Sequence, residues 1–95
     1  RIFSSHEYNY AINKSNPEQC FAGIWCAKEA TIKAFGKKKK LNVKQIEIRC
    51  SKNNAPEAVV SKNVKLNLKY IISISISHTK DFATAVAVIE LINEK

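Results

Sequence analysis

The chain has 95 residues and a formal net charge of +8. Its hydrophobic fraction of 45% and charged fraction of 25% exclude a disordered chain, so we expect a single globular domain over residues 1–95. No apolar run approaches the roughly eighteen residues that a membrane span needs, whereas the excess of positive charge indicates an anionic partner.

The first predicted element is a short helix from Ser5 to about Ile12. Ser4 and Glu7 have the spacing of a capping box, which marks the beginning of a helix. His6 lies among polar neighbours in this helix, and we interpret it as a solvated surface histidine. The polar segment 13–16 separates this helix from the next one.

The stretch from Phe21 to Gly36 is predicted to be a long helix around which the rest of the chain is organised. Asn16 is expected to be its N-cap, with Pro17 in the first turn and Gln19 completing a capping-box-like pair. Gly36 stands where a residue with positive φ ends a helix. Apolar residues recur along one face at helical spacing, namely Phe21, Ile24, Ile32 and Phe35, with Ala27 and Ala34 beside them.

A second face of this helix carries Trp25, Glu29 and Lys33 at intervals of four residues. Spacing alone favours an ordinary surface ion pair between Glu29 and Lys33, worth about 0.3–0.5 kcal/mol. The four lysines at 37–40 that follow are interpreted as a solvated loop, or alternatively as an electrostatic funnel for phosphate.

The cysteines are too few and too irregular to define a site. Cys20, Cys26 and Cys50 are odd in number and lack the spacing of two cysteines separated by two residues. Reduced, partly buried thiols are therefore expected rather than a disulfide framework or a zinc site.

Extended segments follow the lysines. Alternation of apolar and polar residues predicts a strand over Asn42–Cys50, a hairpin loop over Ser51–Pro56 and renewed pairing over Glu57–Val60. A further amphipathic segment from Val64 to Tyr70 is also predicted to be extended.

The C-terminal part is predicted to be an antiparallel hairpin with His78 at its mouth. Three isoleucines alternate with three serines over 72–77, which has the period of two typical of a strand. Phe82–Leu91 is apolar on both faces, as in a central, covered strand. The predicted fold class is α+β, with a long core helix packed on a small antiparallel sheet.

Four segments together resemble a known family. They are the FAG-x-W-x-AKEA-x-x-KA-x-G pattern of Phe21–Gly36, QIEIR at Gln45–Arg49, the turn ending at Pro56 and SISHTKDFATAVAVIE at Ser75–Glu90. Over nearly the whole chain they resemble the holo-acyl-carrier-protein synthases, the small trimeric 4′-phosphopantetheinyl transferases. Arg1–Glu7 is similar to the segment that precedes this family's core helix.

The resemblance implies an activity and a site. Members transfer the 4′-phosphopantetheine group of coenzyme A to a serine of acyl carrier protein and release adenosine 3′,5′-bisphosphate. Glu29 matches the family's ligand for Mg²⁺, and Lys33 matches the lysine that reaches the phosphates. His78, followed by Thr79, matches the motif at the coenzyme A site. The resemblance also implies a homotrimer with active sites between subunits.

Two departures from the family pattern stand out. The family begins with a strand that carries a second metal-ligand aspartate, and this segment is expected to be missing before Arg1; Asp81 falls in the hairpin turn and is no substitute. Ile24 stands where many members carry an arginine that contacts coenzyme A.

The basic residues are expected to serve two partners. By resemblance, acyl carrier protein docks on Ser5–Ile12 and its flanks, where Arg1 and Lys14 are the available cations. Lys37 and Lys38 are expected to act on coenzyme A instead. The expected location is the cytoplasm, or a plastid-like organelle in a eukaryotic cell. A basic nucleic-acid-binding module and a catalytically incomplete fragment remain as alternatives, although few aromatic residues are available to stack on bases and we expect no nucleic-acid partner.

Overall fold

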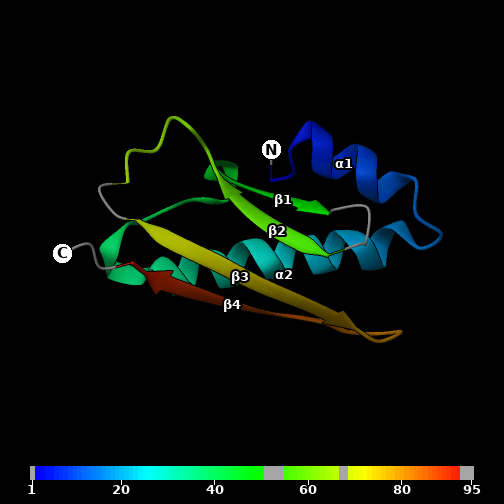
Figure 1. The fold of residues 1–95 in the computed structure, drawn as a ribbon. Coiled ribbons are helices and arrows are strands. Elements are labelled where there is room, and N and C mark those ends of the chain that lie inside the picture. Colours follow the sequence, from blue (N-terminus) through cyan, green and yellow to red (C-terminus); the bar gives the residue numbers. More distant parts are fainter. Residues whose placement is uncertain (1, 51–54, 67–68, 93–95) are drawn as a thin grey trace.

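The computed structural model describes residues 2–50, 55–66 and 69–92. Its helices and strands are α1 (Ser5–Ile12), α2 (Pro17–Phe35), β1 (Ile46–Cys50), β2 (Pro56–Val60), β3 (Tyr70–His78) and β4 (Ala83–Leu91). Two short 3₁₀ turns, η1 (Gly36–Lys38) and η2 (Val43–Gln45), lie between α2 and β1. Figure 1 shows the β3–β4 hairpin running along the length of α2.

Helix α1 begins with the predicted capping box. The backbone N–H of Glu7 donates to Ser4 Oγ (3.1 Å), and the Ser4 N–H donates to Glu7 Oε1 (2.8 Å). Both groups would otherwise lack a partner at the helix end, so the box fixes where α1 starts.

Helix α2 confirms the predicted ends but not the predicted pairing of Gln19. Asn16 is the N-cap and its side chain accepts from the Gln19 N–H (3.2 Å), with Pro17 as the first helical residue. The Gln19 side chain does not return to the cap, because its Nε2 donates to the Thr79 carbonyl (2.6 Å) in the β3–β4 turn. Gly36 ends the helix with φ of 54°, a conformation that favours glycine.

The apolar stripe of α2 forms the centre of the core. Ile24, Ala27 and Phe35 are buried, and Phe21 and Ile32 pack against them. The prediction for Ala34 is wrong, since its side chain is exposed. The buried stripe that faces α1 and both hairpins is therefore narrower than the sequence pattern suggested.

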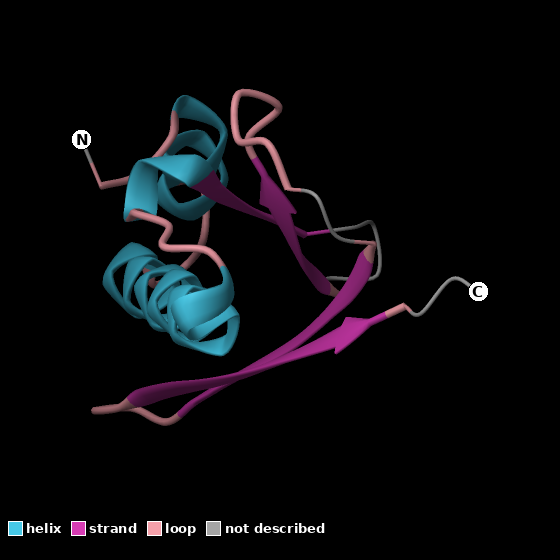
Figure 2. Ribbon diagram, turned by 90° about the vertical axis from the view of Figure 1, so that its left-hand side faces the viewer, coloured by secondary structure: helices cyan, strands magenta, loops and turns pink. Residues whose placement is uncertain are grey.

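The strands form two separate antiparallel hairpins rather than one sheet. In the first, Ile46 pairs with Val60 and Cys50 with Pro56, which confirms the predicted hairpin. Residues 51–54 of the predicted Ser51–Pro56 loop lie outside the described residues. Figure 2 shows this hairpin beside α2, with the β3–β4 hairpin passing below the helix.

Two extended segments were predicted wrongly. Asn42–Gln45 is not a strand because the Asn42 side chain accepts from Lys44 N–H (3.0 Å) and starts η2. Val64–Leu66 does not pair with a strand. The Val64 N–H donates to the Ser61 carbonyl in a turn (3.0 Å), and the Val64 side chain packs against the core. Residues 67–68 of this prediction lie outside the described residues, and β3 begins at Tyr70.

The β3–β4 hairpin confirms the predicted period of two. Ile72, Ile74 and Ile76 lie on the inner face and pack against the core. The prediction that Phe82–Leu91 is a central, covered strand is wrong for the single chain, because among the described strands β4 pairs with β3 and with no other. On its outer face Val86 is 62% exposed and Val88 is 50% exposed.

None of the helices described is both long enough and apolar enough to cross a membrane.

Candidate active site

Glu29 and Lys33 lie on the outward side of α2, in its second half. Glu29 is half-buried and Lys33 is exposed. No ion pair joins them, since the ion pairs among the described residues are Glu7–Lys28 and Glu47–Arg49. The Glu29 carboxylate is therefore available to a ligand, with a lysine one helical turn away.

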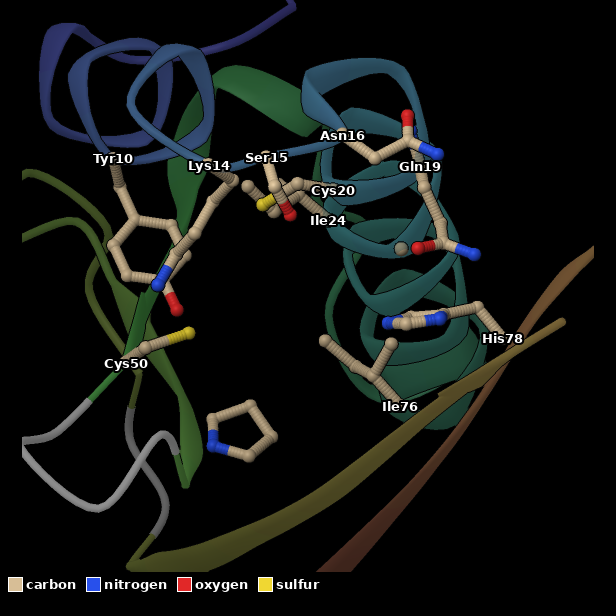
Figure 3. Close-up of a pocket in the computed structure, with 12 residues that line it drawn as sticks. Tyr10, Lys14, Ser15, Asn16, Gln19, Cys20, Ile24, Cys50, Ile76 and His78 are labelled. Carbon is tan, nitrogen blue, oxygen red and sulfur yellow. The ribbon is translucent and has the colours of Figure 1, made fainter. Parts of the chain in front are cut away.

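A cavity of about 340 Å³ lies at the other end of α2 (Figure 3). It is bounded by the end of α1, the first turns of α2, the end of the β1–β2 hairpin at which Cys50 pairs with Pro56, and the end of β3. Its apolar wall includes Ile24 and Ile76, and its polar groups come from residues of the α1–α2 connection, α2 and β3. The lining residues are Tyr10, Lys14, Ser15, Asn16, Gln19, Cys20, Gly23, Ile24, Cys50, Pro56, Ile76 and His78.

His78 enters this cavity from the last position of β3, as Figure 3 shows. The turn that follows is fixed by Thr79, whose N–H donates to the Phe82 carbonyl (2.7 Å) and whose Oγ1 accepts from the Phe82 N–H (3.2 Å). The Thr79 carbonyl also accepts from Gln19 Nε2, so this turn is tied to the first turns of α2. Asp81 lies in the same turn, as predicted, and is exposed.

Lys14 lines the same cavity as His78, although the two were predicted to serve different partners. Its Nζ lies 4.3 Å from the centre of the Tyr10 ring. Hydrogen bonding to the Tyr10 side chain raises the pKa of Lys14, and burial raises the pKa of Tyr10. Arg1, the other predicted docking residue, lies outside the described residues.

The lysine run lies at the opposite end of α2 from this cavity (Figure 1). Lys37 and Lys38 belong to η1 and are exposed. Lys38 lines a small cavity of about 100 Å³ together with Ala34, Phe35, Ile89 and Leu91. The structure therefore separates the predicted coenzyme A residues into two groups, one around His78 and one beyond Lys33.

The two groups occupy different parts of the helix. The α2 residues that line the cavity run from Gln19 to Ile24, and Glu29 follows Ile24 by five residues, which corresponds to about 7.5 Å along an α-helix. Neither of the two cavities described above is lined by Glu29 or Lys33. Glu29 and Lys33 therefore lie outside the cavity that His78 enters.

The thiols agree with the prediction of reduced cysteines. Cys20, Cys26 and Cys50 are free and partly buried, and Cys26 Sγ lies 3.5 Å from the Ala83 carbonyl and donates to it. Burial raises the pKa of Cys20, which favours its protonated form. In the described part of the chain, no three His, Cys, Asp or Glu side chains are grouped as a metal site would need.

A buried ion pair beside the candidate site was missed by the sequence analysis. Lys28 Nζ donates to Glu7 Oε1 (2.7 Å) and to the Ile2 carbonyl (2.7 Å), and Glu7 Oε2 accepts from the Ile48 N–H (2.7 Å). Glu7 and Lys28 are 0% and 1% exposed. Lys28 follows Ile24 by four residues, so its position on the apolar stripe was a signal that it is buried.

Comparison with known proteins gives consistent results. The family described as the 4′-phosphopantetheinyl transferase superfamily matches residues 1–87. A fatty acid synthase subunit alpha of Candida parapsilosis is 40% identical over 95% of this chain, but the chain spans only 5% of that protein. A holo-[acyl-carrier-protein] synthase of Thermodesulfovibrio yellowstonii is 38% identical, over 94% of this chain and 74% of the synthase.

A similar fold is known from a crystal structure. The holo-[acyl-carrier-protein] synthase of Helicobacter pylori, solved in complex with coenzyme A, superposes with a TM-score of 0.76. The two proteins are 35% identical, over 95% of this chain and 78% of the other. Similarity in sequence and in fold thus extends over nearly all of the chain.

Proposed function

The chain belongs to the 4′-phosphopantetheinyl transferase superfamily, and on this basis we propose that it transfers the 4′-phosphopantetheine group of coenzyme A to a serine of apo acyl carrier protein. The other product is adenosine 3′,5′-bisphosphate. The observation that carries the proposal is the similarity to holo-acyl-carrier-protein synthases over 94–95% of this chain, including one solved with coenzyme A.

Transfer requires a phosphorus–oxygen bond of the pyrophosphate to break. The serine hydroxyl of the carrier attacks the phosphorus that bears pantetheine and releases its proton to water, and the phosphate of the nucleotide leaves with the electrons of the broken bond. Negative charge grows on the leaving oxygen, so a fixed cation nearby lowers the barrier. Lys33 is exposed on α2 and available for this role.

Glu29 is proposed to hold Mg²⁺ for this reaction. Mg²⁺ in phosphate-transferring sites is often bound by one or two carboxylates together with substrate phosphates. A single half-buried carboxylate without a protein partner, one turn from a lysine, fits that requirement when the pyrophosphate supplies further oxygen ligands. When bound, the ion would neutralise phosphate charge.

A homotrimer is proposed to complete the site. Glu29 lies in the second half of α2 and does not line the cavity that His78 enters, so we propose that one coenzyme A molecule contacts Glu29 of one copy and His78 of a neighbouring copy. The exposed valines on the outer face of β4 supply an apolar surface for such an assembly.

The proposal can be tested with the purified chain, apo acyl carrier protein, coenzyme A and Mg²⁺. Mass spectrometry should show one phosphopantetheine group added to the carrier serine. Glu29→Gln should abolish this addition while the melting temperature stays unchanged, because Glu29 makes no ion pair with any of the described residues. Lys44→Gln, a change at an exposed lysine of η2, should retain activity.

Two results would contradict the proposal. One is the absence of transfer by a folded wild-type chain, which would support the incomplete-fragment alternative. The other is tighter binding of generic RNA than of coenzyme A at the same salt concentration, which would favour a nucleic-acid-binding module.

A further inference from the structure

The net positive charge of the chain is concentrated in two connections, the α2–β1 connection (36–45) and the β2–β3 connection (61–69). Eight of the lysines lie there, namely the run at 37–40 and Lys44, Lys62, Lys65 and Lys69. The two connections contain no aspartate or glutamate. The eight other lysines and arginines of the chain equal its eight acidic residues in number, so the net charge of +8 belongs to these two connections.

The fold brings the two connections to one end of the molecule. The Ser61 N–H donates to the Gln45 carbonyl (2.8 Å), which joins the start of the β2–β3 connection to η2. The rings of Phe35 and Tyr70 meet edge to face with their centres 5.4 Å apart, which joins the end of α2 to the start of β3. Figure 1 shows both connections at the end of the molecule opposite the β3–β4 turn. We call this end, with its eight lysines, the lysine end.

The lysine end also presents apolar side chains. Val64 and Leu66 pack against the core, whereas Lys62 and Lys65 of the same connection are exposed. Neither of the ion pairs among the described residues involves Lys62 or Lys65. Leu91 and Ile92 at the end of β4 are 43% and 46% exposed. They lie beside these lysines, since Leu91 pairs with Tyr70 and the Ile92 N–H donates to the Lys69 carbonyl (2.9 Å).

The composition of the lysine end favours a lipid surface over a folded macromolecule. All eight cations are lysines, and both arginines of the chain lie in other segments. Protein interfaces are enriched in arginine and depleted in lysine, because the guanidinium group forms paired, directional hydrogen bonds. The two connections contain no aromatic residue that could stack on the bases of a nucleic acid.

A membrane with anionic headgroups matches the remaining features. Clustered lysines are attracted to such a surface without needing a fixed geometry, and neighbouring apolar side chains enter the boundary between headgroups and acyl chains. We propose that the lysine end binds the surface of membranes that contain anionic phospholipids. This peripheral contact goes beyond the proposed transfer reaction and does not depend on it.

The test measures co-sedimentation of the full chain with vesicles. Vesicles of equal parts phosphatidylcholine and phosphatidylserine should bind the wild-type chain, and vesicles of phosphatidylcholine alone should not. Added salt should release the chain, because it screens exposed charges. Each lysine near an anionic surface contributes about 1 kcal/mol, or about a factor of five in the binding constant.

Matched variants locate the contact. Lys65→Gln should weaken binding to the mixed vesicles about fivefold, and the double variant Lys62→Gln with Lys65→Gln about thirtyfold. Lys80→Gln is the same change at an exposed lysine of the β3–β4 turn, at the opposite end, and should leave binding unchanged. Circular dichroism should show equal melting temperatures for all of these proteins. Lys62 and Lys65 are not among the residues predicted to bind coenzyme A, so their effect is independent of that site.

Three results would overturn the proposal. They are failure of the wild-type chain to bind the mixed vesicles, equal binding to mixed and neutral vesicles, and equal losses for Lys65→Gln and Lys80→Gln. Tighter binding of RNA or of an acidic carrier protein at the same salt concentration, with the same dependence on Lys62 and Lys65, would also overturn it and assign the lysine end to that partner. A chain that binds the mixed vesicles but transfers no phosphopantetheine would support the membrane contact and contradict the proposed function.

Discussion

Lys28 is a charged residue that belongs to the core. Its ammonium group is bonded to Glu7 and to the Ile2 carbonyl, while Glu7 also accepts from backbone N–H groups at the start of α1 and in β1. Four segments of the chain therefore meet at one ion pair. Removal of one partner leaves a buried charge without compensation, which is far more costly than loss of a surface ion pair.

Lys28→Met should reduce the free energy of unfolding by about 3–5 kcal/mol, because the Glu7 carboxylate stays buried without its cation. Urea denaturation followed by circular dichroism measures this loss. Lys33→Met is the matched control, because Lys33 is an exposed lysine of the same helix. This change should alter the free energy of unfolding by less than about 0.5 kcal/mol.

The double variant Glu7→Gln with Lys28→Met provides an internal check. Glutamine still offers an oxygen to the Ile48 N–H, and no isolated charge remains. The double variant should be more stable than Lys28→Met alone. A double variant of equal or lower stability would show that the buried charge is not the source of the loss.

At the scale of helices and strands, the sequence predicts most of what local patterns determine. The caps at Ser4 and Asn16, the stop at Gly36 and the alternation of 72–77 are local signals, and each is confirmed. Asn42–Gln45 and Val64–Leu66 were misassigned because alternation over so few residues does not distinguish a strand from a turn packed on the core.

The arrangement of the candidate site depends on long-range contacts that no local pattern contains. The sequence places Lys14 and His78 sixty-four positions apart. The turn of α1 onto α2, the packing of β3 on α2 and the Gln19–Thr79 hydrogen bond bring both residues to one cavity. The same contacts separate His78 from Glu29. Family resemblance named these residues, whereas the fold determines which of them can share a ligand.

The close approach of α2 to β3 gives a prediction at this scale. A Cβ atom on Gly23 would lie 3.0 Å from Ile76 Cγ2, which is tighter than ordinary contact. Gly23→Val should therefore overpack the interface and lower the free energy of unfolding by about 1–3 kcal/mol. Glycine has a lower helix propensity than valine, so the loss does not come from propensity; Ala22→Val, at the exposed neighbouring position, is the control for a valine side chain in this turn of the helix. Equal effects of the two changes would contradict the tight approach.

At the scale of the whole molecule, the outer face of the β3–β4 hairpin gives a prediction about assembly. Val86, Val88 and Ile71 are each at least half exposed on it. If this face joins the copies of the proposed trimer, Val86→Lys should convert the assembly to monomers and abolish transfer, since a buried lysine without a partner is costly. Light scattering measures the mass, and Asn63→Lys in an exposed turn is the control for added charge. An active wild-type monomer would contradict this proposal.

The positive charge of the molecule gives the last prediction, because the lysines at 37–40 and Lys14 lie at opposite ends of α2. Lys33 lies in the last turn of α2 and the lysine run begins two residues after the helix ends, so we expect the run to extend the phosphate-binding surface around Glu29 and Lys33. Replacement of all four lysines by glutamine should then raise the KM for coenzyme A severalfold. It should also flatten the dependence of that KM on salt, because exposed charges are screened over about 8 Å at physiological ionic strength.

The acidic carrier is the competing target of the same lysines. A variant without the run should keep its KM for acyl carrier protein if the run acts on the nucleotide. Steady-state kinetics with each substrate varied in turn, at two salt concentrations, separate the possibilities. Loss of carrier binding alone would mean that the lysine run is the docking surface, which would contradict the role predicted from sequence for these lysines.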